Sequence, residues 1–198
     1  MRIKSQWFKS DRQKTPEEIA GAMAFTIWRI ADNALKNTRR ANFEIAIGPQ
    51  YFSFLTEFLV FLIQVADRIA HRQLSAEARF AFTSTLANRV AETLAENQSR
   101  LMDGSIAGYK QQFIDKLNQR AEEYAEFHYD STGAGFAFAR YLAYCMREVV
   151  DEKDAIWVID QMMSIEVPEA VTMVEKTMRD LFEIKPGQSR SAKAAGGG

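Results

Sequence analysis

Cysteine and histidine are scarce in this sequence of 198 residues, which holds one cysteine and two histidines. The single cysteine, Cys145, excludes an intrachain disulfide and any zinc site built on paired cysteines. Its neighbours Tyr144 and Met146 continue an apolar helical pattern, so we interpret Cys145 as a small core residue. The first residues, MRIKSQWFKSDRQK, contain no apolar segment of the kind that a secretory signal needs. These features predict a protein of a reducing compartment, the cytoplasm.

Proline and glycine are also few. The chain has four prolines and ten glycines, and three of the glycines stand at the end of the sequence. Because these residues mark turns, their scarcity favours long helices over many short strands. The length suits one domain, and the apolar share of 47% is enough for that domain to bury a core.

The signatures of several enzyme classes are missing. The sequence contains no G-x-S-x-G motif, and neither histidine follows an acidic residue at the spacing found in di-iron carboxylate bundles. Gly133 and Gly135 precede a predicted helix, but no predicted strand comes before them, which argues against a phosphate-binding loop. The sequence therefore favours a non-enzymatic protein and identifies no cofactor.

Start signals and helical periodicity predict an all-α protein. Thr15 and Glu18 form a capping box with Pro16 in the first turn, and Ser75 is a typical cap of a later helix. We expect a bundle of five long helices, the second one central and buried, plus a short C-terminal helical pair. Asp154 is the expected cap of that pair, and Pro168 the expected boundary within it. The expected helices cover about 16–39, 49–73, 76–100, 106–129, 136–152, 155–165 and 168–183.

The second of these helices contains the most apolar run, YFSFLTEFLVFLIQVA, at positions 51–66. Its apolar side chains surround nearly the whole helix, and such a helix is buried in a core or in a bilayer. The uninterrupted apolar part is shorter than the roughly 20 residues that a membrane span needs, and Glu57 lies in its middle. We therefore expect the core of a protein without a transmembrane segment.

Polar residues of this helix share one narrow stripe: Ser53, Glu57, Gln64, Arg68 and His71, with Asp67 beside its end. The stripe is either a solvent-facing seam or a polar track inside the bundle, and a buried Glu57 needs partners. In the second case Ser53, Glu57, Gln64 and His128, which extends the apolar stripe of the fourth helix, are candidate ligand-binding residues. Asp67 and His71, at i and i+4, are candidate metal ligands or an acid–base pair.

Charge divides the chain into three parts. Residues 1–14 form a basic arm of charge +4, and residues 185–198 form a basic, glycine-rich tail of charge +3 that we expect to be disordered. The formal charge of −1 then leaves −8 for a single helical domain at 15–184. An acidic body argues against nucleic-acid binding. The arm is a candidate for peripheral membrane contact, and the candidate partner surface comprises Trp7, Phe8, Trp157, Met162 and Met163.

Three functions are consistent with these features. The first is a non-enzymatic interaction or regulatory protein that self-associates or binds a protein partner. The second is a binder of an apolar small molecule in an aromatic- and Met-lined cavity of the bundle. The third is a metal-dependent enzyme that uses Asp67 and His71.

Overall fold

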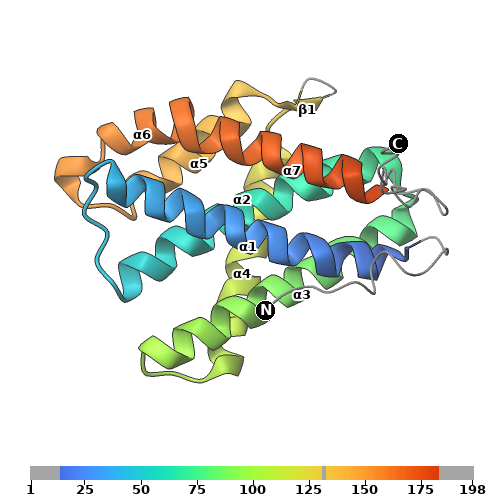
Figure 1. The fold of residues 1–198 in the computed structure, drawn as a ribbon, viewed down its shortest axis with the longest axis horizontal. Coiled ribbons are helices and arrows are strands. Elements are labelled where there is room, and N and C mark those ends of the chain that lie inside the picture. The colour runs from blue at the N-terminus through green and yellow to red at the C-terminus, as the bar shows by residue number, and fades with distance from the viewer. Residues whose placement is uncertain (1–13, 131–132, 183–198) are drawn as a thin grey trace, which may run out of the picture.

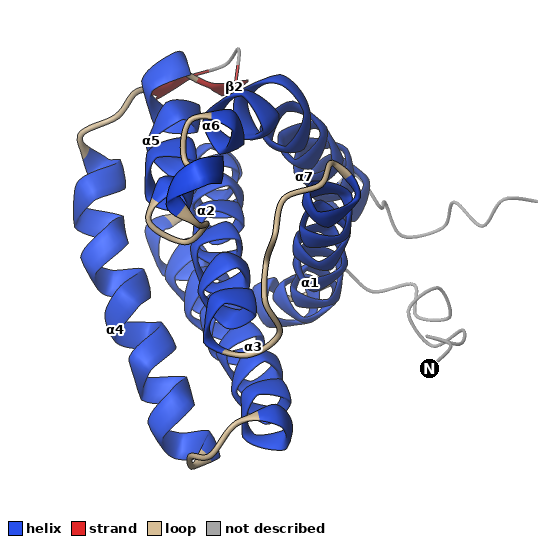
Figure 2. Cartoon of the chain, turned by 90° about the vertical axis from the view of Figure 1, so that its left-hand side faces the viewer, coloured by secondary structure: helices blue, strands red, loops and turns tan. Residues whose placement is uncertain are grey.

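Helix α2 (Pro49–Gln73) lies at the centre of the structure, and the other helices cover it (Figures 1 and 2). The computed structural model describes residues 14–130 and 133–182, so Trp7, Phe8 and the tail at 185–198 lie outside the described residues. The prediction of an all-α bundle around a buried second helix is confirmed. The helices that contact α2 are α1 (Pro16–Arg40), α3 (Ala76–Leu101), α4 (Ile106–Ala125), α5 (Phe136–Arg147) and α7 (Val167–Phe182).

Aromatic rings join α2 to the helices around it. The ring of Phe61 lies 6.2 Å from those of Phe58 and Tyr124 and 5.7 Å from that of Phe138. All four side chains are buried. Rings at these separations contribute both buried area and favourable edge contacts, so the cluster fixes α4 and α5 against α2. No helix within the described ranges is long and apolar enough to cross a membrane.

Helix starts follow the sequence signals. The Thr15 hydroxyl accepts a hydrogen bond from the backbone N–H of Glu18, and the Glu18 carboxylate accepts one from the backbone N–H of Thr15. Ser75 caps α3 in the same way through the N–H of Ala78. Gly48, the residue before α2, has a φ of 120°, a backbone conformation that residues with a Cβ rarely adopt. Local chemistry thus sets where α1, α2 and α3 begin.

The end of α4 differs from the expectation. The helix stops at Ala125, and Tyr129–Asp130 (β1) pairs in an antiparallel hairpin with Gly133–Ala134 (β2). The backbone N–H of Gly135 closes this hairpin by donating to the carbonyl of His128. His128 consequently lies beyond the helix with its side chain exposed, and does not extend the buried stripe of α4.

Helix α5 ends at Arg147, earlier than expected, and the segment after it bonds to distant residues. The side chain of Gln50, in the first turn of α2, donates to Asp151, and the backbone N–H of Glu44 in the α1–α2 connection donates to Asp154. Asp154 therefore holds a distant loop and does not cap α6 (Trp157–Gln161). These long-range bonds have no signature in the local sequence.

Pro168 does not separate two helices. Helix α6 continues through a π-helical segment, Met162–Glu166, directly into α7. The N–H of Val167 donates to the carbonyl of Met162, five residues earlier. Since proline has no N–H and its ring crowds the preceding turn, a wider turn before Pro168 lets the helix continue where the sequence predicted a break.

The aromatic cluster predicts a strong and position-specific effect on stability. Phe61→Ala should lower the free energy of unfolding by about 3–5 kcal/mol, because it opens a cavity among buried rings. Phe80→Ala, at a ring that is 74% exposed, is the matched control and should change it by less than about 0.5 kcal/mol. Urea unfolding measures both. Equal effects would contradict the central position of α2.

Candidate functional site

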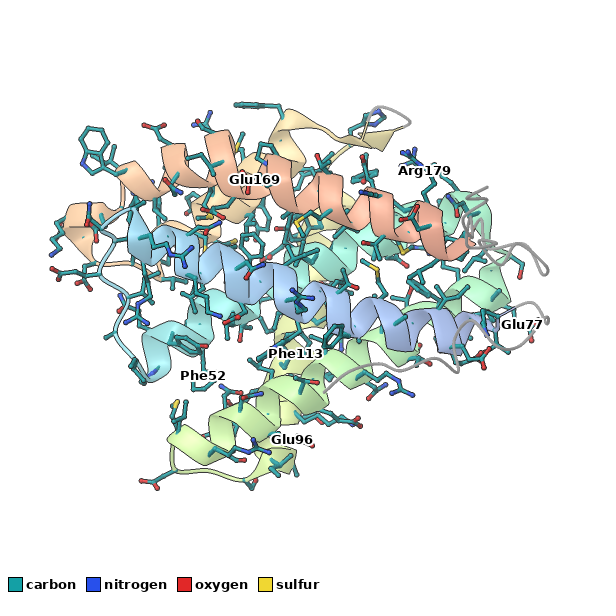
Figure 3. All side chains as sticks on the ribbon, viewed as in Figure 1. Phe52, Glu77, Glu96, Phe113, Glu169 and Arg179 are labelled. Atoms are coloured by element: carbon teal, nitrogen blue, oxygen red, sulfur yellow. The ribbon has the colours of Figure 1, made fainter. Side chains whose placement is uncertain are left out.

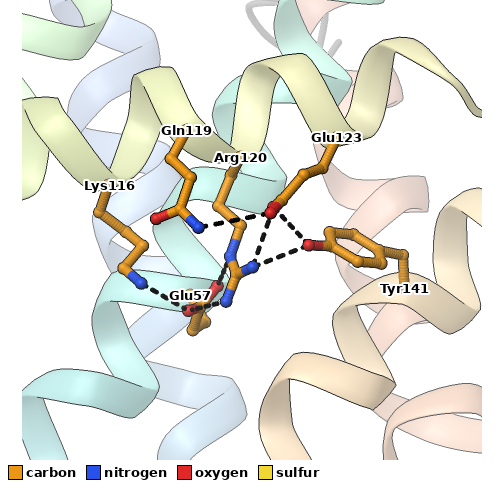
Figure 4. Close-up of polar contacts among 6 residues, drawn as sticks. All are labelled: Glu57, Lys116, Gln119, Arg120, Glu123 and Tyr141. Carbon is orange, nitrogen blue, oxygen red and sulfur yellow. Dashed lines mark hydrogen bonds and ion pairs between the residues drawn. The ribbon is translucent and has the colours of Figure 1, made fainter.

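A buried ion pair joins α2 to α4. The carboxylate of Glu57 accepts two hydrogen bonds from Arg120, at 3.0 Å from Nε and 2.8 Å from Nη2 (Figure 4). Glu57 is 8% exposed and Arg120 is 9% exposed. This side-on geometry uses both carboxylate oxygens and is the strongest form of such a pair. The middle of the polar stripe on α2 therefore lies inside the bundle.

The remaining guanidinium nitrogen of Arg120 faces a second group of polar side chains. Arg120 Nη1 donates to Glu123 at 2.9 Å and to the Tyr141 hydroxyl at 2.7 Å, and that hydroxyl donates to Glu123. The guanidinium also lies 5.6 Å from the Tyr141 ring centre. Every nitrogen of Arg120 is thus bonded, and the network links α2, α4 and α5.

These contacts shift the pKa values of Arg120, Glu123 and Tyr141. Burial alone lowers the pKa of Arg120, but its bonds to Glu57 and Glu123 outweigh burial and raise that pKa above its ordinary value. Burial also raises the pKa of Glu123, but the bonds from Tyr141 and Arg120 outweigh it, so the pKa lies below its usual range. The pKa of Tyr141 is raised, first by burial and second by its hydrogen bond to Glu123.

Cys145 lies beside this network and is buried. Burial, and next the charge of Glu57, raise the pKa of its thiol to about 12. A thiol is a nucleophile only when it is deprotonated. The environment therefore favours the unreactive, protonated form, in agreement with the interpretation of Cys145 as a core residue.

The Glu57–Arg120 pair lines a cavity of about 420 Å³ between α2, α3, α4 and α5. Phe52 and Phe113, labelled in Figure 3, contribute rings to its wall. Lys116 lines the polar end, where its Nζ lies 3.9 Å from Glu57 Oε1. The other lining residues are Pro49, Ser53, Thr56, Leu94, Gln98, Met102, Tyr109, Gln112, Cys145, Glu148 and Val149. The cavity thus combines aromatic and Met side chains with a charged end.

The predicted ligand-binding residues separate in space. Ser53 and Glu57 line this first cavity, whereas Gln64 lines a second one, of about 460 Å³, between α2, α3 and α4. His128 belongs to neither lining. The polar stripe on α2 is buried in its middle and exposed at both ends. Its middle is therefore a polar track inside the bundle, and its ends form a solvent-facing seam.

Asp67 and His71 both contact Arg79. The Asp67 carboxylate accepts from Arg79 Nε at 2.9 Å, from Arg79 Nη2 and from the Thr83 hydroxyl at 2.7 Å. Arg79 Nη1 lies 3.1 Å from Nδ1 of His71. Within residues 14–130 and 133–182, no group of three or more His, Cys, Asp or Glu side chains is placed to hold a metal ion. The surroundings of the pair are those of an ion-paired network.

The predicted partner surface divides between core and surface. Trp157 is 65% exposed, Met163 is half-buried, and Met162 is fully buried in the core. Met162 begins the π-helical segment and belongs to the hydrophobic core. Among the three of these residues that the structure describes, Trp157 is the most exposed.

Sequence reasoning missed Arg120 and Tyr141. A signal for Arg120 existed, because it stands three residues after Leu117 and four before Tyr124, both on the buried face of α4. An arginine on a buried face implies a buried acidic partner. No local pattern identifies Tyr141, whose role depends on how α5 packs beside α4.

No family model, curated protein or solved structure matches this chain.

The ion pair predicts strongly non-additive mutations. Glu57→Leu and Arg120→Met should each lower the free energy of unfolding by about 3–5 kcal/mol, because each leaves a buried charge without its main partner. The double variant should cost less than the sum of both, and urea unfolding completes the cycle.

The control for this cycle is Lys36→Met, at the exposed ion pair with Asp32, with an expected cost below about 0.5 kcal/mol. Additive effects at Glu57 and Arg120 would show that the two side chains do not interact in solution.

Proposed function

We propose that this protein is a non-catalytic binding protein for a small amphiphilic molecule, held in the cavity lined by Phe52, Phe113 and Lys116. The observation that carries the proposal is the cavity of about 420 Å³ with the Glu57–Arg120 pair at its polar end. This volume lies in the range of roughly 300–1,000 Å³ typical of ligand pockets. The ligand's apolar body lies against the aromatic and aliphatic wall.

The head of this ligand is recognised by Lys116. Both oxygens of Glu57 are already bonded to Arg120, and every nitrogen of Arg120 has a partner. Lys116 Nζ, in contrast, is 3.9 Å from the nearest Glu57 oxygen, beyond hydrogen-bond length, so its donors are available. The cavity side chain with a cationic group to offer is therefore Lys116, which favours a carboxylate or similar anionic head.

Decanoate is a suitable probe of this proposal, and isothermal titration calorimetry measures its binding. Saturable binding is expected, and Lys116→Met should weaken it roughly tenfold, the equivalent of about 1.4 kcal/mol. Decanol, which has the same chain without the charge, should bind Lys116→Met and the unchanged protein equally.

Lys110→Met is the matched control, since Lys110 lies on the same helix but pairs with Glu92 outside the cavity. It should bind decanoate normally. Absence of saturable binding, or equal weakening by both lysine variants, would contradict the proposal.

A second candidate function is binding of an acidic protein segment by the exposed face of α5. Phe136 is 69% exposed and Tyr144 is 53% exposed. Arg140 lies 5.8 Å from the Phe136 ring centre, and Arg147 lies 5.9 Å from that of Tyr144. Neither arginine forms an ion pair with a described residue. Arginine and aromatic side chains are the types that dominate protein interfaces, and two uncompensated positive charges favour an acidic partner.

Fluorescence anisotropy with a labelled peptide of repeated Glu-Glu-Leu tests this second function. Binding should be saturable and should weaken as salt is added. The double variant Arg140→Glu and Arg147→Glu should abolish it. Arg29→Glu is the matched control, because Arg29 also lies over an aromatic ring, Phe25, but has no second pair beside it. Binding that survives the double variant would exclude the α5 face as the site.

A further inference from the structure

Gln64 is a buried polar side chain without a protein partner. It lies in the middle of α2 and is 8% exposed, yet its amide forms no hydrogen bond with any residue that the structure describes. Buried amides are nearly always bonded to protein or to water, because an unbonded one has lost its water and gained nothing in exchange. The donor and acceptor of the Gln64 amide are therefore left for water or for another molecule.

The amide of Gln64 is open to the second cavity. In the described part of the chain, no completely enclosed side-chain nitrogen or oxygen lacks a hydrogen-bond partner. Since the Gln64 amide has no such partner, its polar atoms have to be accessible, and Gln64 lines the cavity of about 460 Å³. The donor and acceptor of the amide are thus available to a molecule in that cavity.

The other charged groups around this cavity satisfy one another. Asp67 is bonded to Arg79 and Thr83, and Arg79 is bonded to Asp67 and lies against His71. The opposite charges of Arg79 and Asp67 balance each other in this ion pair, so the pair adds no net charge to the cavity. The cavity is therefore suited to an uncharged ligand whose polar edge reaches Gln64.

The lining combines apolar and uncharged polar side chains. Its apolar part comes from three helices and comprises Ile63, Ala87, Leu117 and Ala121; the exposed ring of Phe80 and the polar side chains of Ser84 and Asn118 also line the cavity. A glutamine amide offers an acceptor and donors side by side, so it pairs best with a planar group that has a donor next to an acceptor. We propose that this cavity is a second binding site, for an uncharged aromatic carboxamide or nitrogen heterocycle whose edge pairs with Gln64.

This site is distinct from the one at Glu57. Gln64 follows Glu57 by seven residues, about two turns or roughly 10 Å along α2. The two cavities have no lining residue in common. Occupation of one can therefore be tested without occupying the other.

Benzamide is the probe, because it combines a flat ring with an amide edge. In NMR titrations of the full chain, saturable shifts are expected at the methyl groups of Ile63, Ala87 and Leu117. Toluene, which lacks the amide, should bind about tenfold more weakly or not at all.

Gln64→Met should weaken benzamide binding about tenfold or more, the loss expected when a ligand's donor and acceptor are left unpaired. Its urea midpoint should equal or exceed that of the unchanged protein, because the amide that it removes bonds to nothing in the protein. A merely structural glutamine would not show this combination. Gln98→Met, in the lining of the first cavity, is the matched control and should bind benzamide normally.

Three results would overturn the proposal. They are the absence of saturable shifts, equal benzamide binding by Gln64→Met and the unchanged protein, and a lowered urea midpoint for Gln64→Met. The last would mean that the amide is bonded within the protein. The decanoate experiment depends on Lys116 and the first cavity, so failure there leaves this test unaffected.

Discussion

Glu57 places a negative charge in the middle of the most apolar helix, and that charge has to be matched where it lies. Arg120 matches it from α4 through two hydrogen bonds. Removing either partner would leave the other charge largely surrounded by protein, so the pair specifies which face of α4 contacts α2. Glu123 and Tyr141 then extend the same network to α5. This pairing acts together with the aromatic cluster around Phe61 to set how α4 and α5 pack on the central helix.

Both cavities lie along the stripe of α2 that carries Glu57 and Gln64. Elsewhere α2 is covered by closely packed apolar side chains, as the rings around Phe61 show. Along the stripe, polar and long charged side chains take the place of these apolar ones. Individual hydrogen bonds hold α4 against this part of α2, and one of them runs from the Arg68 side chain to the carbonyl of Tyr124. Such side chains fill space less completely than interlocking apolar ones, which explains why the hollows accompany the polar residues.

The sequence was sufficient for features that depend on local chemistry. The capping box at Thr15, the cap at Ser75 and the apolar run of α2 identified the early helices and the central one, because each signal acts within a few residues. It was insufficient where distant segments meet. Asp154 was expected to cap a helix but binds Glu44, and Pro168 was expected to break a helix that a π-helical segment carries onward.

The candidate site shows the same division. Periodicity placed Glu57 and Gln64 on one face of α2, but only the packing of α4 decides that this face is internal. Periodicity also placed Asp67 near His71, but it did not reveal that Arg79, on the next helix, contacts both side chains. Residues on one helix can be aligned from sequence, whereas the partner that determines their chemistry comes from another helix.

Hydrogen exchange at the Nε–H of Arg120 tests this account most directly, because that proton is bonded to Glu57. In protein labelled with ¹⁵N-arginine, the Arg120 signal should persist under mildly alkaline conditions in which the signals of exposed arginines such as Arg29 are lost to exchange. Exchange at Arg120 as fast as at Arg29 would mean that the guanidinium faces water, which contradicts a bundle organised around a buried ion pair.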